Sequence, residues 1–141
     1  MTTVKTLRPG NATGPLLILD EPLSLWGGVD VHTGEIVEQS HPQVGENMAE
    51  KIVVLPHGRG SSSSSSVLAE LLRVGLGPVG LVLDQPDSIL VVGAIVAESL
   101  YGARCPIVVG RIDGHSGEIW TIADGSMRLV KAGREDDGIC R

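Results

Sequence analysis

Six consecutive serines, Ser61 to Ser66, are the residues of this 141-residue chain best placed to form a binding or catalytic site. They follow Gly58, Arg59 and Gly60. Serine is favoured at helix N-caps, and free backbone N–H groups in a first helical turn bind carboxylate, phosphate or alkoxide. Arg59 adds a planar, permanently charged group suited to a carboxylate or a phosphate. The two glycines would let the backbone approach a ligand closely. This stretch is therefore predicted to be an anion-binding site.

A strand and a helix must position these serines. Residues 52–55 form a short apolar, β-branched run that Pro56 closes, which is typical of a buried strand. After the serines, residues 67–72 carry apolar side chains at helical spacing, while Glu70 and Arg73 fall on the opposite face. The chain is expected to enter the serine turn from a buried strand and to leave it through an amphipathic helix.

Two structural interpretations compete with a site. A Ser-rich run can be a flexible linker between domains, but these serines lie between two elements too short to stand alone. A plain helix N-cap with surplus serines is the second alternative, and the sequence leaves it open. The turn lacks the lysine of a Walker loop and the third glycine of a dinucleotide-binding motif. Nucleotide binding is therefore disfavoured.

Composition limits the partners of the chain. With 11 Lys and Arg against 17 Asp and Glu, a formal charge of -6, two Trp, one Tyr and no Phe, the chain offers no basic surface or stacking platform for nucleic acid. The first residues lack a signal-peptide core, and the longest apolar run, Ile89 to Ala97, is far below the roughly 20 residues that span a bilayer. We expect a soluble cytoplasmic protein that binds neither nucleic acid nor membrane.

No metal or cofactor site is expected within the chain itself. Cys105 and Cys140 form no CxxC pair or disulfide framework. An iron–sulfur cluster needs three or four converging thiolates, so two cysteines cannot hold one. The four histidines are scattered without metal-ligand spacing. Cys105 is expected to be a buried thiol, and Cys140 to lie in a polar tail.

The order of apolar and turn segments predicts the fold. Residues 1–14 are expected to be a flexible arm, 15–133 one domain and 134–141 a disordered tail. Strands are predicted at residues 16–19, 52–55, 79–83, 107–109, 118–122 and 127–131, and the last two are expected to form a hairpin. A helix is predicted from about residue 91 to 101. Residues 29–37 are expected to form a hairpin rather than a helix. These elements predict an α/β fold, a layered β/β/α domain with a partly parallel, barrel-like sheet.

Asp30, in the sequence GGVD, is the other conspicuous polar residue. It is a possible site residue, but Asp is common in turns and a solvated turn carboxylate explains it equally well.

Several blocks carry a family resemblance: DEPLSLWGGVD followed by TGEI, then HPQVGENM, VVLPHGRGSSSSSSVLAEL, GPVGLVL and DSILVVGAIVA, in this order over about residues 14 to 110. With them the chain resembles the small subunit, or swivelling domain, of the aconitase X family of hydro-lyases. The N-terminal arm and the segment after about Gly110 contribute little to it. The resemblance implies a dehydratase of two different subunits, in which this domain closes over a larger chain that carries an iron–sulfur cluster or iron.

The resemblance also implies roles for the serine turn. Ser61, the first serine after Gly60, would act as the catalytic base, with Arg59, Gly60, Ser62 and Ser63 as substrate-binding residues. For Ser62 and Ser63 a capping role explains the sequence equally well. Catalysis would require the serine turn to face the larger chain, so Arg59 in the isolated chain is expected to be solvent-exposed or paired with an acidic group, with Asp30 and the Gly27-Gly28 turn on the same rim.

The substrate class remains open between two members of the family. A small hydroxy acid such as cis-3-hydroxy-L-proline is preferred, because Arg59 is the only obvious cation near the turn. Mevalonate 5-phosphate is the alternative substrate, and a non-catalytic anion-binding module is the alternative to an enzyme.

Overall fold

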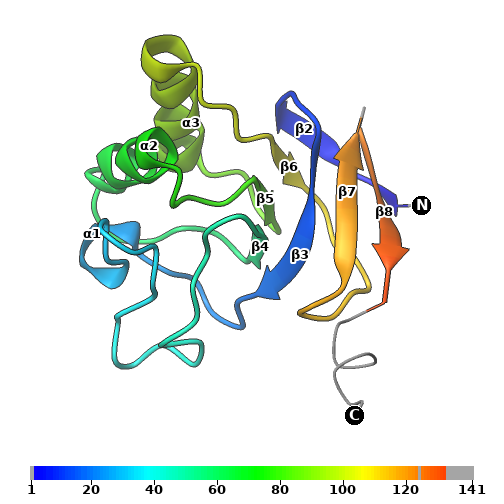
Figure 1. Cartoon of the computed structure of the whole chain (residues 1–141), viewed down its shortest axis with the longest axis horizontal. Helices are drawn as coiled ribbons and strands as arrows, with labels where there is room; N and C mark the ends of the chain where they lie inside the picture. The colour runs from blue at the N-terminus through cyan, green and yellow to red at the C-terminus, as the bar shows by residue number, and fades with distance from the viewer. Residues whose placement is uncertain (1, 124, 133–141) are drawn as a thin grey trace.

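The computed structural model describes residues 2–123 and 125–132; the predicted disordered tail and Cys140 lie outside them. The strands are β1 (Thr2–Thr3), β2 (Lys5–Arg8), β3 (Ala12–Ile18), β4 (Ile52–Leu55), β5 (Gly80–Leu83), β6 (Ile107–Val109), β7 (Ile119–Ala123) and β8 (Ser126–Lys131). The helices are α1 (Leu25–Gly28), α2 (Ser64–Val74) and α3 (Ser88–Tyr101). Figure 1 shows their arrangement.

The eight strands form one mixed sheet in the order β1-β8-β7-β3-β4-β5-β6-β2. The strands β3, β4, β5 and β6 pair in parallel, and the other pairs are antiparallel. Only Val4 separates β1 from β2, so the two ends of this strand order lie next to each other and the sheet nearly closes. The predicted partly parallel, barrel-like sheet is confirmed.

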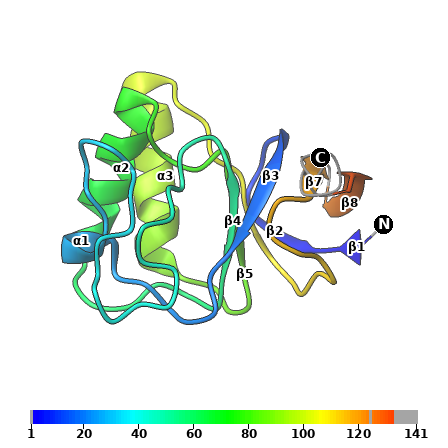
Figure 2. The ribbon, with the colours of Figure 1, turned by 60° about the horizontal axis from the view of Figure 1, so that its bottom comes forward.

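Alternating side chains of the central strands build two cores. In β4, Ile52 packs inside the barrel with Trp120 and Met127, whereas Val53 and Leu55 pack against the helices. Figure 2 shows the helices on one side of β3, β4 and β5, with β7, β8 and β1 on the other side. The predicted β/β/α layering follows from this period of two along each strand.

The segment expected to be a flexible arm belongs instead to the sheet. β1 pairs with β8, β2 pairs with β6, and Val4 between them is 7% exposed. Three of the four residues of β2 are polar, but edge strands are held by backbone hydrogen bonds that do not depend on apolar side chains. The prediction of a flexible arm, which rested on the polar composition of residues 1–14, is therefore wrong.

Two other elements differ from the sequence prediction. α3 begins at Ser88, before the expected start near residue 91, because the Asp87 side chain caps its first turn. α1 is a short helical turn where none was expected, and its Trp26 and Gly27 have non-helical backbone angles. The hairpin predicted over 29–37 is reduced to a single antiparallel bridge between Val29 and Ile36. The predicted hairpin of β7 and β8 is confirmed.

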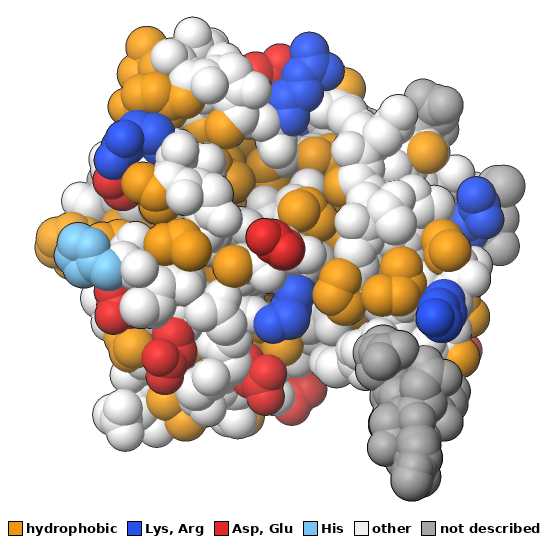
Figure 3. All heavy atoms as spheres, viewed as in Figure 1, with side chains coloured by type: hydrophobic (Ala, Val, Ile, Leu, Met, Phe, Trp, Pro, Cys, Tyr) orange, Lys and Arg blue, Asp and Glu red, His pale blue; other side chains and the backbone are white. Residues whose placement is uncertain are grey.

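The helices and the surface bear on the expected absence of membrane and nucleic-acid binding. In the described part of the chain, no helix is both long and apolar enough to cross a membrane. On the face shown in Figure 3, Lys and Arg side chains lie among Asp and Glu side chains.

Cys105, which precedes β6, is buried, and burial raises the pKa of its thiol to about 12. The unfolded thiol ionises near pH 9, so the buried neutral thiol stabilises the fold fully below pH 9 and loses this contribution between pH 9 and 12. We expect Cys105→Ala to remove this pH dependence. In urea unfolding, the stability difference between wild type and variant should shrink by about 2 kcal/mol between pH 8 and 10.5. A constant difference would contradict the burial of the thiol.

Candidate functional site

Two distant stretches of the chain meet at the serine turn. Leu23 forms a parallel bridge with Gly58, and the N–H of Arg59 donates to the Leu23 carbonyl at 3.3 Å. One turn further, the N–H of Trp26 donates to Ser64 Oγ at 3.1 Å. The EPLSLWGG and GRGSSSS segments, which carried the resemblance most specifically, therefore form one structural unit.

The glycines of the turn make contacts within the chain possible. Gly60 has a φ of +88°, and a Cβ there would lie 2.7 Å from Ser24 Oγ. A Cβ at Gly58 would lie 2.8 Å from Asp87 Oδ2. Both positions thus require glycine because other parts of the protein approach the backbone closely. The two glycines predicted a close approach here, but the approaching atoms belong to the chain itself and not to a ligand.

Asp87 fixes the start of the turn, and sequence analysis did not identify it. Its Oδ2 accepts from the Gly58 N–H at 2.9 Å, and its Oδ1 accepts from the N–H groups of Ile89 and Leu90 at 3.0 and 3.1 Å. One carboxylate therefore caps α3 and anchors the serine turn. The N-cap signal was present in the sequence, where Asp87 precedes an apolar helical run.

The serine turn uses most N–H groups of the first turn of α2. Those of Ser64 and Ser65 donate to the carbonyls of Ser61 and Ser62 at 3.0 and 3.1 Å. The Ser63 N–H donates to Ser61 Oγ at 3.0 Å, which places a backbone donor on that hydroxyl oxygen. Among the described residues, the N–H groups of Ser61 and Ser62 have no acceptor. The free backbone N–H groups expected in the first turn of the helix thus lie just before it, at Ser61 and Ser62.

A small pocket of about 40 Å³ opens beside this turn. Its polar lining consists of Gly58, Arg59, Ser61, Ser64 and Asp87, with apolar side chains from α1, α3 and the Leu23 segment. Arg59 and Ser61 are therefore brought together as predicted. Ser62 and Ser63 are exposed and do not line the pocket.

Ser64 is the serine that sequence analysis missed. It is 4% exposed, lines the pocket and accepts the Trp26 N–H, and within the described part of the chain its hydroxyl hydrogen has no acceptor. Residues three apart in a helical turn lie on the same side, so Ser61 and Ser64 share the pocket side while Ser62 and Ser63 point elsewhere. This spacing was the signal that could have identified Ser64.

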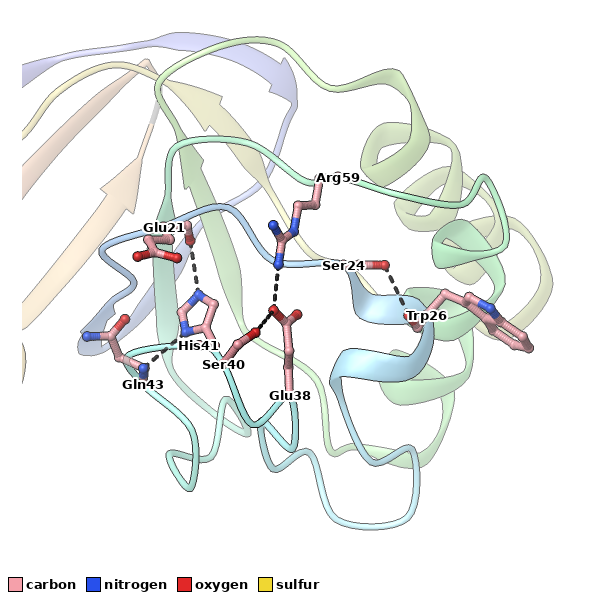
Figure 4. A network of polar contacts seen from close by, with 8 residues as sticks. All are labelled: Glu21, Ser24, Trp26, Glu38, Ser40, His41, Gln43 and Arg59. Carbon is pink, nitrogen blue, oxygen red and sulfur yellow. Dashed lines mark hydrogen bonds and ion pairs between the residues drawn. The ribbon is translucent and has the colours of Figure 1, made fainter.

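Arg59 is ion-paired with Glu38, a residue that no sequence motif indicated. The Arg59 guanidinium donates through Nη2 to Glu38 Oε2, and Ser40 Oγ donates to the same oxygen at 3.1 Å (Figure 4). The Arg59 side chain is 48% exposed. The prediction that Arg59 would be exposed or paired with an acidic group is confirmed.

Asp30 does not line the pocket. Its Oδ1 accepts from the His32 N–H at 2.8 Å, and its carbonyl accepts from Thr33 and Gly34, so it stabilises a turn. The preceding Gly28 lies nearer the site, because its carbonyl accepts from the Glu38 N–H at 3.3 Å. The turn role left open by the sequence explains these contacts of Asp30.

No histidine lines this pocket, and Asp87 is its one carboxylate. Throughout residues 2–123 and 125–132, no three His, Cys, Asp or Glu side chains gather as metal ligands. His41 is buried. Its Nε2 lies 3.1 Å from the carbonyl of Glu21, 20 residues earlier in the sequence, and its Nδ1 accepts from the Gln43 N–H (Figure 4). The Gln43 N–H can donate only to an unprotonated Nδ1, so the neutral ring carries its proton on Nε2.

Known proteins resemble the chain along most of its length. A family described as the aconitase X swivel domain matches residues 1–136. The cis-3-hydroxy-L-proline dehydratase of Pseudomonas aeruginosa is 41% identical over 128 residues, covering 89% of this chain and 22% of that protein. The phosphomevalonate dehydratase small subunit of Pyrococcus furiosus is 35% identical over 130 residues, covering 84% of this chain and 92% of that protein.

A solved structure shares the fold. The crystal structure of aconitase X from Thermococcus kodakaraensis, in its holo-form, superposes with a TM-score of 0.83 at 25% sequence identity, covering 92% of this chain and 98% of the matched chain. Lengths differ among the relatives: the chain spans about a fifth of the cis-3-hydroxy-L-proline dehydratase but nearly all of the phosphomevalonate dehydratase small subunit.

Proposed function

Because this chain belongs to the aconitase X swivel domain family, we propose that it is the small subunit of a hydro-lyase, which dehydrates a small hydroxy acid with a larger partner chain. The observation that carries the proposal is the pocket in which Ser61 lies beside Arg59 at the start of α2. A hydroxyl and a fixed cation side by side suit a substrate that carries a carboxylate and must lose a proton.

Ser61 is proposed to be the catalytic base. Dehydration removes a proton from one carbon and hydroxide from its neighbour, and Ser61 Oγ would take the proton as an alkoxide. An alkoxide needs strong stabilisation, which the Ser63 N–H supplies at 3.0 Å and the nearby Arg59 reinforces. Exclusion of water on closure would strengthen both interactions.

The remaining polar groups of the pocket are proposed to hold the substrate. Arg59 would bind the carboxylate through its guanidinium. Gly60 gives the turn its shape, and the free Ser62 N–H, which lies outside the pocket lining, would be a donor to a part of the substrate that extends beyond the pocket. Ser64 would donate its hydroxyl hydrogen into the pocket, a role that suits it better than Ser63, which is exposed.

The partner is proposed to carry an iron–sulfur cluster or iron, and a heterodimer is the simplest assembly. Such a centre would supply Lewis-acid chemistry for the departing hydroxide. The division of labour assigns proton removal and anion binding to this chain.

For the substrate we favour a compound of the cis-3-hydroxy-L-proline kind over mevalonate 5-phosphate. Among the residues that line the pocket only Arg59 is cationic, and a phosphorylated substrate would gain from a second fixed positive charge. The 41% identity to a cis-3-hydroxy-L-proline dehydratase supports the same choice.

The test is reconstitution with the proposed larger partner chain, which is sought first among the adjacent genes. The purified pair should release water from cis-3-hydroxy-L-proline, while this chain alone should be inactive. Mevalonate 5-phosphate is assayed in parallel, and a clear preference for it would reverse the substrate choice. Full activity of the isolated chain would refute the two-subunit proposal, and anion binding without turnover by the pair would favour a non-catalytic module.

Trp26 provides a test of which surface meets the partner. Its side chain is 59% exposed and points away from the Arg59–Glu38 pair (Figure 4), while its N–H contacts Ser64 at the pocket. If the serine turn faces the partner, binding should move the ¹⁹F signal of Trp26 in a chain labelled with 5-fluorotryptophan. Trp120, which is 6% exposed inside the barrel, is the internal control. A moved Trp120 signal beside an unmoved Trp26 signal would place the interface elsewhere.

A further inference from the structure

We infer that Glu38 is an internal anion that holds the Arg59 guanidinium until the anionic group of a ligand displaces it. The inference deepens the proposed function, because it concerns the residue that would bind the substrate carboxylate. It makes Glu38 a positioning residue that sets the affinity of the pocket for anions.

The pair joins two segments that are far apart in the sequence. Arg59 lies in the serine turn and Glu38 lies 21 residues earlier, in the loop that follows the Gly28 turn. In Figure 4 the Arg59 side chain reaches across from its own segment to the Glu38 carboxylate. Ser40 donates to the same carboxylate oxygen, so Glu38 is itself held in place.

The backbone of Arg59 is fixed without Glu38. Its N–H donates to the Leu23 carbonyl, and the preceding Gly58 is anchored by Asp87. Glu38 therefore determines only where the Arg59 side chain lies. The pair is partly exposed, with side-chain exposures of 48% for Arg59 and 20% for Glu38, so the guanidinium can exchange partners without unfolding the loop.

The charges that line the pocket favour this exchange. Arg59 is the only cation among the residues that line the pocket, and the Asp87 carboxylate is already satisfied by three backbone N–H groups. An entering anion therefore competes with Glu38 for the positive charge of Arg59. The exchange of one carboxylate for another keeps Arg59 paired while closure removes water, and the displaced Glu38 carboxylate keeps its hydrogen bond from Ser40.

The test compares Glu38→Gln with the wild-type chain. Glutamine keeps a hydrogen-bonding oxygen for Ser40 and Arg59 but removes the charge. Inorganic phosphate and acetate are titrated into the ¹⁵N-labelled chain, and the Nε–Hε signal of Arg59 is followed, with Arg59→Lys identifying it. In Glu38→Gln the Kd of both anions should fall about fivefold, since an exposed ion pair is worth at most about that factor.

Glu70→Gln is the matched control. It releases Arg73 from a similar exposed pair on α2, outside the pocket, and should leave the Arg59 titration unchanged. In the reconstituted dehydratase, Glu38→Gln should lower the KM about fivefold with kcat unchanged, and in the Arg59→Ala background it should have no effect.

Three outcomes would overturn the inference: an equal or higher Kd in Glu38→Gln, an Arg59 signal that responds to neither anion in both chains, or an effect that persists without Arg59. The titration needs neither partner nor turnover. A failure of the dehydratase proposal would therefore leave its result standing, and a failure of the titration would leave the assignment of Ser61 as base untouched.

Discussion

Ser61→Ala in the reconstituted complex is expected to lower kcat about 10²- to 10⁴-fold, the usual contribution of a positioned acid or base, while KM stays close to its wild-type value. The substitution removes the hydroxyl proposed to take the proton. It also removes the acceptor of the Ser63 N–H, a single hydrogen bond worth about 1 kcal/mol, so the fold should persist. Steady-state kinetics with circular dichroism of the variant measure both effects.

Ser66→Ala is the control from the same serine run. Ser66 is exposed and lies in α2, outside the pocket, so its loss should leave kcat and KM unchanged. Weakened substrate binding with an unchanged kcat for Ser61→Ala would assign this serine a binding role, and would favour the anion-binding module over the dehydratase.

Arg59→Ala should reduce kcat/KM of the complex on the order of 10²- to 10³-fold, because a charged hydrogen-bond partner of the substrate is lost in a site that closure makes dry. The melting temperature of the isolated chain should hardly change, since the pair of Arg59 and Glu38 is partly exposed and such pairs contribute little stability. Arg59→Lys keeps the charge but not the planar fork, and is expected to give an intermediate rate.

The control for Arg59 is Arg73→Ala, which removes an arginine that is ion-paired with Glu70 and equally exposed, but distant from the pocket lining. It should leave both kcat/KM and the melting temperature nearly unchanged. A large drop in melting temperature for Arg59→Ala alone would show that Arg59 is structural and that the site has been assigned wrongly.

The predictable parts of this fold are those where one local signal decides the structure. The bounds of β4 and β6 were predicted correctly, because an apolar β-branched run next to a proline has few alternatives. The start of α3 was predicted late, because its apolar residues fit both helix and strand, and only the Asp87 cap resolves the ambiguity. The polar N-terminal strands gave no signal, because their partners β6 and β8 come about 100 residues later.

The same distinction holds for the site. Ser61 and Arg59 were predicted from the local motif, and the pocket contains both. Ser64 was missed because six identical side chains do not by themselves show which of them faces inward; the three-residue spacing of the helical turn from Ser61 would have indicated it. Glu38 was missed because its pairing with Arg59 depends on how the loop after Gly28 folds back over the serine turn, and no periodicity encodes this path.

Because only Val4 separates β1 from β2, the same short segment at the start of the chain pairs with both ends of the sheet, and this bears on self-association. Because β1 pairs with the first two residues of β8 and β2 pairs along β6, residues 2–8 cover part of one strand edge and all of the other, and both edges could otherwise pair with another molecule. Detachment of this segment would expose unpaired backbone groups on both β8 and β6. Each molecule could then pair through these two edges with two other molecules. The residues that cover these edges take no part in the pocket.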